Sequence, residues 1–153
     1  KSFSNDEGRT WDGLYTTPLD GCHAPTARLL PSGKVLVTYR YQQGGSLGAY
    51  LSTPPDWHRQ YPTARAGGPT SYFARNTFAY LENVESAKAR ELDQQGGIVL
   101  PLDHDRSHRP HSGYTGTVVL HTGQIFCVNY VVDDAPEAQI RGYWFDEGDF
   151  YIV

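Results

Sequence analysis

Along most of the chain, apolar and polar residues alternate with a period of two, and short clusters of Gly, Pro, Asp and Ser interrupt the alternation. This pattern predicts antiparallel strands joined by tight turns. The clearest hairpin has strands at residues 26–30 and 34–41 on either side of a glycine turn. A short strand is predicted before it, at residues 13–17, and a third strand after it, at residues 46–52.

The second half of the chain repeats this arrangement. Gly33 and Gly123 close two similar turns, Leu-Pro-Ser-Gly and Leu-His-Thr-Gly, which stand ninety residues apart. Similar turns at this distance indicate two blade-like β-units with an insertion between them. The strands predicted for the second half are residues 97–102, 114–120, 124–132 and 138–145.

Residues 74–92 follow a different pattern. Phe78, Leu81 and Val84 recur at a spacing of three among good helix formers, which predicts a helix with Asn76 as its N-cap. We expect this short helical insertion to pack against a strand edge, and the alternative is a lid over the mouth of a site.

Composition and charge narrow the class of protein. The 153 residues suffice for one domain with a core of its own, and the 13% aromatic content favours strands. The formal net charge is −4 and no basic block occurs, so we expect no nucleic-acid partner. No apolar run approaches the ~20 residues of a membrane span, so we expect no membrane partner. Cys22 and Cys127 do not form a C-x-x-C pair, which argues against a disulfide framework and a thiolate zinc site.

The first motif lies near the start of the chain. Ser4 and Asp6 are short polar side chains that hydrogen-bond to nearby backbone, and Gly8 is free to adopt positive φ. Thr10 adds a hydroxyl, and Trp11 adds a large ring to bury. These residues predict a tight, self-bonded turn with a hydrophobic anchor.

With the spacing S-x-D-x-G-x-T-W, this turn resembles the Asp-box of sialidases and other BNR-type β-propellers. Residues 23–40 resemble the family segment in which an inner strand, a glycine turn and a strand ending in arginine follow one another. Residues 112–130 resemble the later segment in which a tyrosine opens the inner strand of the final blade. The resemblance covers nearly the whole chain except about residues 60–95.

The resemblance implies an all-β fold of about two to three antiparallel blades of a sialidase-type β-propeller. Residues 1–153 would form a single partial propeller domain. Because the chain begins inside a blade motif and contains no Met, we expect it to be the C-terminal fragment of a longer protein.

The resemblance also implies roles for single residues. Arg40 matches an arginine of the family triad that holds the substrate carboxylate, a role suited to the guanidinium fork. Tyr114 matches the family's nucleophile, which a neighbouring glutamate activates. The register of that glutamate falls near His23 or Ala24, so His23 is the candidate base. The alternatives are that Tyr114 is a half-buried strand tyrosine and that Arg40 pairs with a carboxylate, Asp56 or Glu82.

We further expect Arg141 and Arg106 to bind substrate. For Arg141, an ion pair with Asp133 or Asp134 is the alternative. Four residues are candidates for the third arginine of the family triad: Arg75, Arg106, Arg109 and Arg141.

Residues 103–111 contain three histidines and two aspartates, a composition that invites a metal. Pro110 and the mixed charges indicate a loop instead, which is solvated or faces a substrate. We therefore expect no metal and no other cofactor.

The favoured function is that of a sialidase-like glycoside hydrolase, which cleaves a terminal acidic sugar by a tyrosine-assisted retaining mechanism. One alternative is a polysaccharide lyase, with His23 and Tyr114 as base and acid and Arg40 on a uronate carboxylate. The other alternative is a glycan-binding propeller without catalysis. The partner is in each case a carbohydrate, and for the two enzymes it carries a carboxylate. Since a propeller needs about four blades or more, we expect upstream blades or identical chains to complete the ring, and no activity without them.

Overall fold

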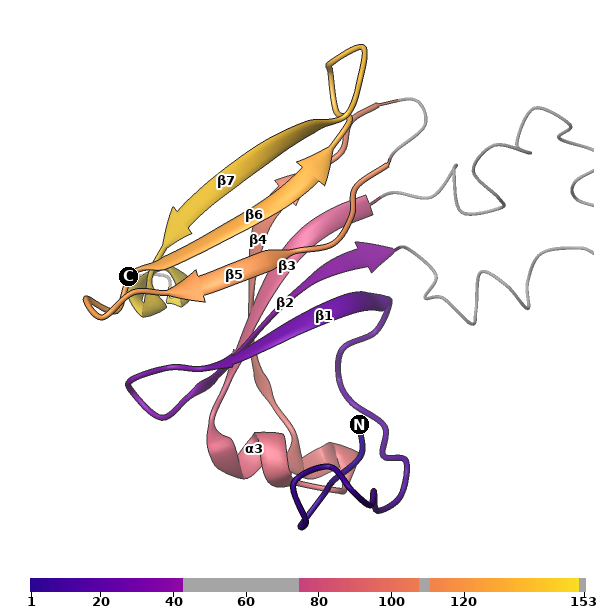
Figure 1. Cartoon of the computed structure of the whole chain (residues 1–153), viewed down its shortest axis with the longest axis vertical. Helices are drawn as coiled ribbons and strands as arrows, with labels where there is room; N and C mark the ends of the chain where they lie inside the picture. Colours follow the sequence, from indigo (N-terminus) through magenta and orange to yellow (C-terminus); the bar gives the residue numbers. More distant parts are fainter. Residues whose placement is uncertain (43–74, 108–110, 152–153) are drawn as a thin grey trace, which may run out of the picture.

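The protein is described by a computed structural model, in which residues 1–42, 75–107 and 111–151 are placed (Figure 1). The fold is all-β, with almost no helix. A four-stranded antiparallel sheet has the order β1-β2-β3-β4, and a three-stranded antiparallel sheet has the order β5-β6-β7. The strands are β1 (Cys22–Leu29), β2 (Val35–Gln42), β3 (Arg75–Glu82), β4 (Gly97–His104), β5 (Gly116–Val119), β6 (Ile125–Val131) and β7 (Gln139–Phe145).

Both predicted hairpins are confirmed, as β1-β2 and β5-β6, and so are the strands that became β4 and β7. Residues 13–17 do not form the predicted strand; Tyr15 instead exchanges two backbone hydrogen bonds with the N-terminal residue Lys1. The strand predicted at residues 46–52 lies outside the described residues.

The prediction of a helix over residues 74–92 with Asn76 as N-cap is wrong. Residues 75–82 form β3, because this segment pairs on one side with β2 and on the other with β4. Two-sided pairing overrides weak helix propensity, and Thr77 and Phe78 suit a strand. The helical part is limited to α3 (Val84–Lys88), capped by Asn83, and the one-turn η3 (Leu92–Gln94). A second one-turn helix, η4 (Glu147–Phe150), follows β7.

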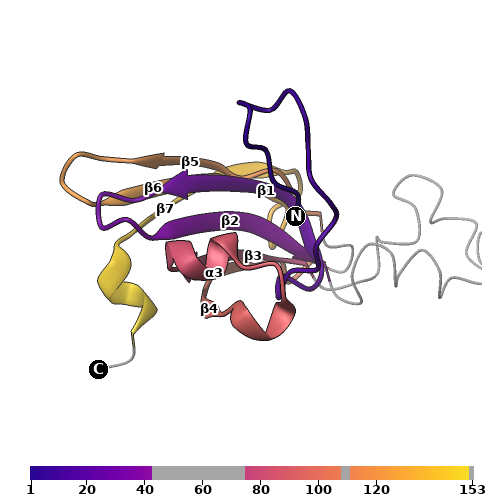
Figure 2. The same cartoon turned by 90° about the horizontal axis from the view of Figure 1, so that it is seen from below.

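The two sheets pack on each other as two layers (Figure 2). Leu36 and Leu81 from the four-stranded sheet meet Ile125 and Cys127 from the three-stranded sheet in one apolar core. Polar side chains continue the contact further along the strands: Asn129 donates to Oγ1 of Thr77 at 2.7 Å. Both sheets are open, and the described residues form no closed propeller.

Candidate functional site

A β-bulge in β1 brings His23 to Arg40. The pairing of β1 with β2 shifts register between His23 and Thr26, and Ala24 inside the bulge has a φ of 47°. One extra residue reverses the face to which the neighbouring side chain points. His23 therefore lies on the same face as Arg40, and its Nδ1 is 3.1 Å from Nη2 of Arg40.

Arg40 also reaches the segment before β5. Its Nη1 donates to the carbonyl oxygen of Ser112 at 2.9 Å, and its Cζ lies 5.8 Å from the ring centroid of Tyr114. Tyr114 is 69% exposed, so it is not the half-buried strand tyrosine of the alternative. The structure thus brings His23, Arg40 and Tyr114 together, and their chemical roles stay predictions.

Three more side chains extend this group. Arg75, 4% exposed, begins β3, and its charge acts on both His23 and His111. The ring of Tyr130 lies 5.3 Å from that of His111 and 6.5 Å from that of Tyr114. We call these six residues the Arg40 cluster: His23, Arg40, Arg75, His111, Tyr114 and Tyr130.

The cluster concentrates positive charge. Burial, together with the charges of Arg40 and Arg75, holds the pKa of His23 below its ordinary value. Burial and the same two arginines lower the pKa of His111, and the nearby Asp105 opposes them. Both imidazoles are therefore neutral at pH 7, where two guanidinium groups remain charged.

The contact with Arg40 fixes the tautomer of His23. A guanidinium only donates hydrogen bonds, so Nδ1 of His23 must accept, and the neutral ring carries its proton on Nε2. This Nε2 is buried and has no hydrogen-bond partner among the described residues, and the same holds for Nε of Arg40 and Oγ of Ser112. Since an unmatched buried polar group costs about 1–3 kcal/mol, three of them around one guanidinium indicate a place for a polar ligand.

A buried carboxylate holds the loop that carries His111. Asp105 is 2% exposed and accepts from the backbone N–H of His111 at 2.8 Å. It also accepts from the N–H groups of Ser107 at 2.9 Å and Asp133 at 3.1 Å. Its own N–H donates to the carbonyl of Arg75 at 3.1 Å. Asp105 therefore ties the start of β3, the β4–β5 connection and the β6–β7 turn together beside the cluster.

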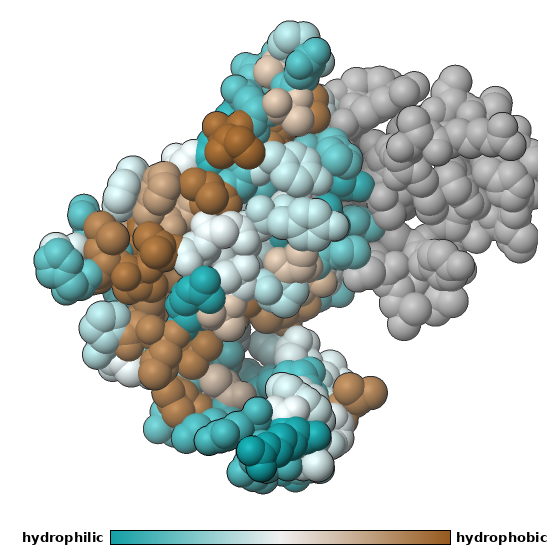
Figure 3. All heavy atoms as spheres, viewed as in Figure 1, coloured by the Kyte–Doolittle hydropathy of each residue, from teal (hydrophilic) through white to brown (hydrophobic). Residues whose placement is uncertain are grey.

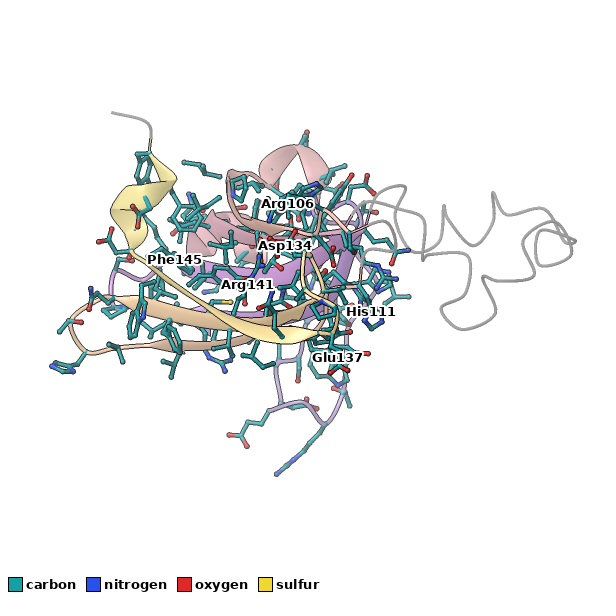
Figure 4. All side chains as sticks on the ribbon, turned by 90° about the horizontal axis from the view of Figure 1, so that it is seen from above. Arg106, His111, Asp134, Glu137, Arg141 and Phe145 are labelled. Atoms are coloured by element: carbon teal, nitrogen blue, oxygen red, sulfur yellow. The ribbon has the colours of Figure 1, made fainter. Side chains whose placement is uncertain are left out.

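Arg106 and Arg141 belong to a separate ion-pair network (Figure 4). An Nη2 atom of each lies 2.7 Å from Oδ2 of Asp133, and Arg141 also lies 3.3 Å from Asp103. Both arginines contact Asp134 as well, which confirms the alternative pairing expected for Arg141. The two arginines hold the pKa of Asp133 well below its ordinary value. Carboxylates of the protein itself already engage both guanidinium groups. Substrate binding by Arg106 and Arg141 stays a prediction.

Two other arginine expectations have different outcomes. Arg40 does not pair with Glu82, since Arg40 lies opposite Thr77 on β3 while Glu82 lies at the far end of that strand and accepts from Ser86. Arg109 and Asp56 lie outside the described residues.

The turn predicted at the start of the chain is present. Asp6 accepts from the backbone N–H of Thr10 at 2.8 Å and from its hydroxyl at 2.7 Å, and Ser4 accepts from the N–H of Gly8 at 2.7 Å. Hydrogen bonds from Thr10 and Ser4 hold the pKa of Asp6 below its ordinary value. The expectation of a buried indole is wrong for the described structure, since Trp11 is 65% exposed.

Other kinds of site find no support in the described part of the chain. No group of three or more His, Cys, Asp and Glu side chains is arranged there to hold a metal ion. The thiols of Cys22 and Cys127 are free. None of the described helices has the length and apolar character needed to cross a membrane.

Gly113 makes room for the cluster. A Cβ at this position would stand 1.5 Å from Cε1 of Tyr130, far closer than any real contact. Gly113→Ala is therefore expected to displace the ring of Tyr130 and to cost about 1–3 kcal/mol of stability. Chemical denaturation checks this, with Gly96→Ala as the control because a Cβ there meets open space. Equal stability of the two variants would contradict the packing described for Tyr130.

Comparison of the chain with protein-family models, with curated proteins and with solved structures gives no match.

Proposed function

We propose that the Arg40 cluster binds the carboxylate of an acidic sugar, and that the chain supplies this subsite and Tyr114 to a sialidase-like glycoside hydrolase. The observation that carries the proposal is the group of three buried polar atoms that lack partners among the described residues: Nε of Arg40, Nε2 of His23 and Oγ of Ser112. Arg75 adds positive charge beside Arg40, which favours an anionic ligand, and the nearby Asp105 offsets part of that charge. A planar carboxylate matches the fork geometry of either guanidinium group.

The other parts of the cluster suit a sugar. The N–H at Nε2 of His23 is a donor in position for a carboxylate or hydroxyl oxygen. The exposed ring of Tyr114, and Tyr130 beside it, provide apolar faces for the carbon–hydrogen surface of a pyranose. Tyr114 is the candidate nucleophile in the hydrolase proposal.

A non-catalytic sugar-binding role is the second candidate, and the tautomer of His23 favours it. With its proton on Nε2 and its Nδ1 facing Arg40, this imidazole is a hydrogen-bond donor to ligand rather than a base. The same observation weighs against His23 as the base of a lyase.

One set of assays separates these proposals. The chain is incubated with a sialoside and with a uronate polymer, and free sugar and the absorbance of an unsaturated uronate are measured. Released sialic acid that Tyr114→Phe abolishes supports the hydrolase, and an absorbance rise supports the lyase. Binding of acidic sugars without either product supports the carboxylate subsite, and it favours the binding role over the hydrolase only for an assembly with a completed ring, because no activity is expected without one. Failure to bind any acidic sugar contradicts the proposed function.

Acidification is expected to strengthen binding of the carboxylate. As pH falls from 7.5 to 5, His111 takes up a proton beside the bound anion, and affinity rises about tenfold. The stability of the free protein is expected to fall on acidification. The pKa values of both histidines are lower in the folded protein than in the unfolded chain. Their contribution to the free energy of unfolding is therefore complete above about pH 6.5 and is lost as the pH falls below it. Calorimetry at three pH values measures the affinity.

Two variants separate the cluster histidines from a surface histidine. His23→Gln combined with His111→Gln removes the pH dependence, whereas His121→Gln, on an exposed turn, leaves it unchanged. Affinity that is flat or falls on acidification would contradict the placement of the anion.

A further inference from the structure

Gln42, the last residue of β2, carries a buried amide group. The residue is 1% exposed. Its Nε2 is buried and has no hydrogen-bond partner among the described residues. An amide nitrogen left unmatched inside a protein destabilises the fold. A group of this kind that a folded chain retains therefore indicates an acceptor that binds there.

The side chain of Gln42 lies on the face of β2 that carries Arg40. The residue between them, Tyr41, points to the opposite face, where its ring stacks on that of Phe78 with the centroids 5.2 Å apart. Arg40 and Gln42 stand two residues apart in the strand, so their Cα atoms are separated by about 6–7 Å. The two side chains are therefore neighbours on one face of the sheet.

Strand pairing joins Gln42 to a second member of the Arg40 cluster. In the register of β2 with β3, Gln42 lies directly opposite Arg75. Side chains of opposite residues point to the same face, with their Cβ atoms about 4.5–5.5 Å apart. Gln42 therefore lies beside both arginines of the cluster.

The start of β1 holds the backbone of Gln42 in place. The N–H of Gln42 donates to the carbonyl of Gly21 at 3.0 Å. Gly21 has a φ of 64°, and a Cβ there would stand 2.5 Å from the carbonyl oxygen of Gln42. Only glycine allows this close approach, so the position of the amide is fixed from both sides of β2.

The amide of Gln42 differs in chemistry from the guanidinium of Arg40. Hydrogen bonds from a charged donor to a carboxylate are about twice as strong as those between neutral groups. The carboxylate of a ligand is therefore expected to bind Arg40. Nε2 of Gln42 donates without adding charge, which suits a neutral oxygen of the same ligand.

The surface on the other side of the cluster is apolar. Ile140, directly opposite Tyr130 of the cluster, is 74% exposed, and Trp144 on the same strand is 59% exposed. Hydrophobic atoms gather on this side of the molecule in Figure 3. Polar partners for the hydroxyl groups of a bound sugar are therefore expected on the β2 side of the cluster, where Gln42 lies.

We propose that Gln42 determines specificity in the carboxylate subsite: its Nε2 donates to a neutral oxygen of the sugar while Arg40 binds the carboxylate. The inference rests on the proposed function of the Arg40 cluster. It distinguishes a sugar acid, which contacts both residues, from a small carboxylate such as acetate, which contacts Arg40 alone.

Titration calorimetry with acetate and with the tighter-binding of two sugar acids, sialic or glucuronic acid, tests this. The natural protein is expected to bind the sugar acid more tightly than acetate. Gln42→Met keeps the length of the side chain without its N–H groups, so it loses about tenfold in affinity for the sugar acid and nothing for acetate. Arg40→Ala weakens binding of both ligands. Gln124→Met, on an exposed turn, changes neither.

A second variant, Gln42→Asn, withdraws the amide by one methylene and is expected to show the same selective loss. If both variants bind the sugar acid as tightly as the natural protein, the inference is overturned and the carboxylate subsite stands. Equal losses for acetate and sugar acid also overturn it, because a purely structural role would produce them. A natural protein that binds neither ligand contradicts the proposed function and this inference with it. Circular dichroism of each variant shows that it folds.

Discussion

Replacing Arg40 with alanine is expected to weaken binding of a carboxylated sugar about a hundredfold. A hydrogen bond to a charged group contributes about 1.5–3 kcal/mol, and about 1.4 kcal/mol corresponds to a tenfold change in affinity. Arg40 uses one N–H on Ser112 and one on His23, so three of its five donors remain for a ligand in the described structure. Titration calorimetry with sialic acid and glucuronic acid measures the loss.

The conservative variant separates charge from geometry. Arg40→Lys keeps the charge but lacks the planar fork, so about a tenfold loss is expected. Arg9→Ala serves as the matched control, because Arg9 is exposed in the Asp6 turn and far from the cluster in the sequence. If Arg40→Ala bound the sugar as tightly as the natural protein, with unchanged stability, Arg40 would not be part of the binding site.

Asp105→Ala is expected to produce the largest loss of stability, about 3 kcal/mol or more. The change leaves the buried backbone N–H of Asp133 and the partly buried N–H groups of Ser107 and His111 without their acceptor. Urea denaturation measures the loss. Asp93→Ala is the matched control, since Asp93 is exposed on η3 and should change stability little.

The same carboxylate makes stability depend on pH. Burial raises the pKa of Asp105, but hydrogen bonds from Ser107 and His111 outweigh it and leave the pKa below its ordinary value. A lowered pKa means that this contribution is present above about pH 4 and is lost as pH falls through the folded value. Asp105→Asn should therefore lose less stability than the natural protein between pH 5 and 3. Identical acid curves would show that Asp105 contributes nothing through its charge.

The alternating pattern predicted the two hairpins because each strand has one face in the core. The turns at Gly33 and Gly123 mark where the two strands of each hairpin end and begin. The pattern failed at residues 75–82. Phe78 and Leu81 stand three apart, which imitates a helix, while the deciding factor is the pairing of this segment with β2 and β4. Local sequence does not contain that pairing.

The site was predictable only in part. The resemblance singled out Arg40, Tyr114 and His23, and the structure brings them together. The extra residue of the bulge that turns His23 toward Arg40 is not visible in an alternation of polar and apolar residues. Arg75 joins the cluster through strand pairing and His111 through a loop held by a buried carboxylate, both across long distances in sequence.

The most direct test of the Arg40 cluster as a carboxylate site is an NMR titration with two ligands that differ only in charge. Sialic acid is expected to shift the side-chain signal of Arg40 and the amides of Ser112 and Tyr114, whereas its methyl ester, without the negative charge, leaves them unchanged. Equal responses to acid and ester, or shifts confined to Arg106 and Arg141, would contradict the account.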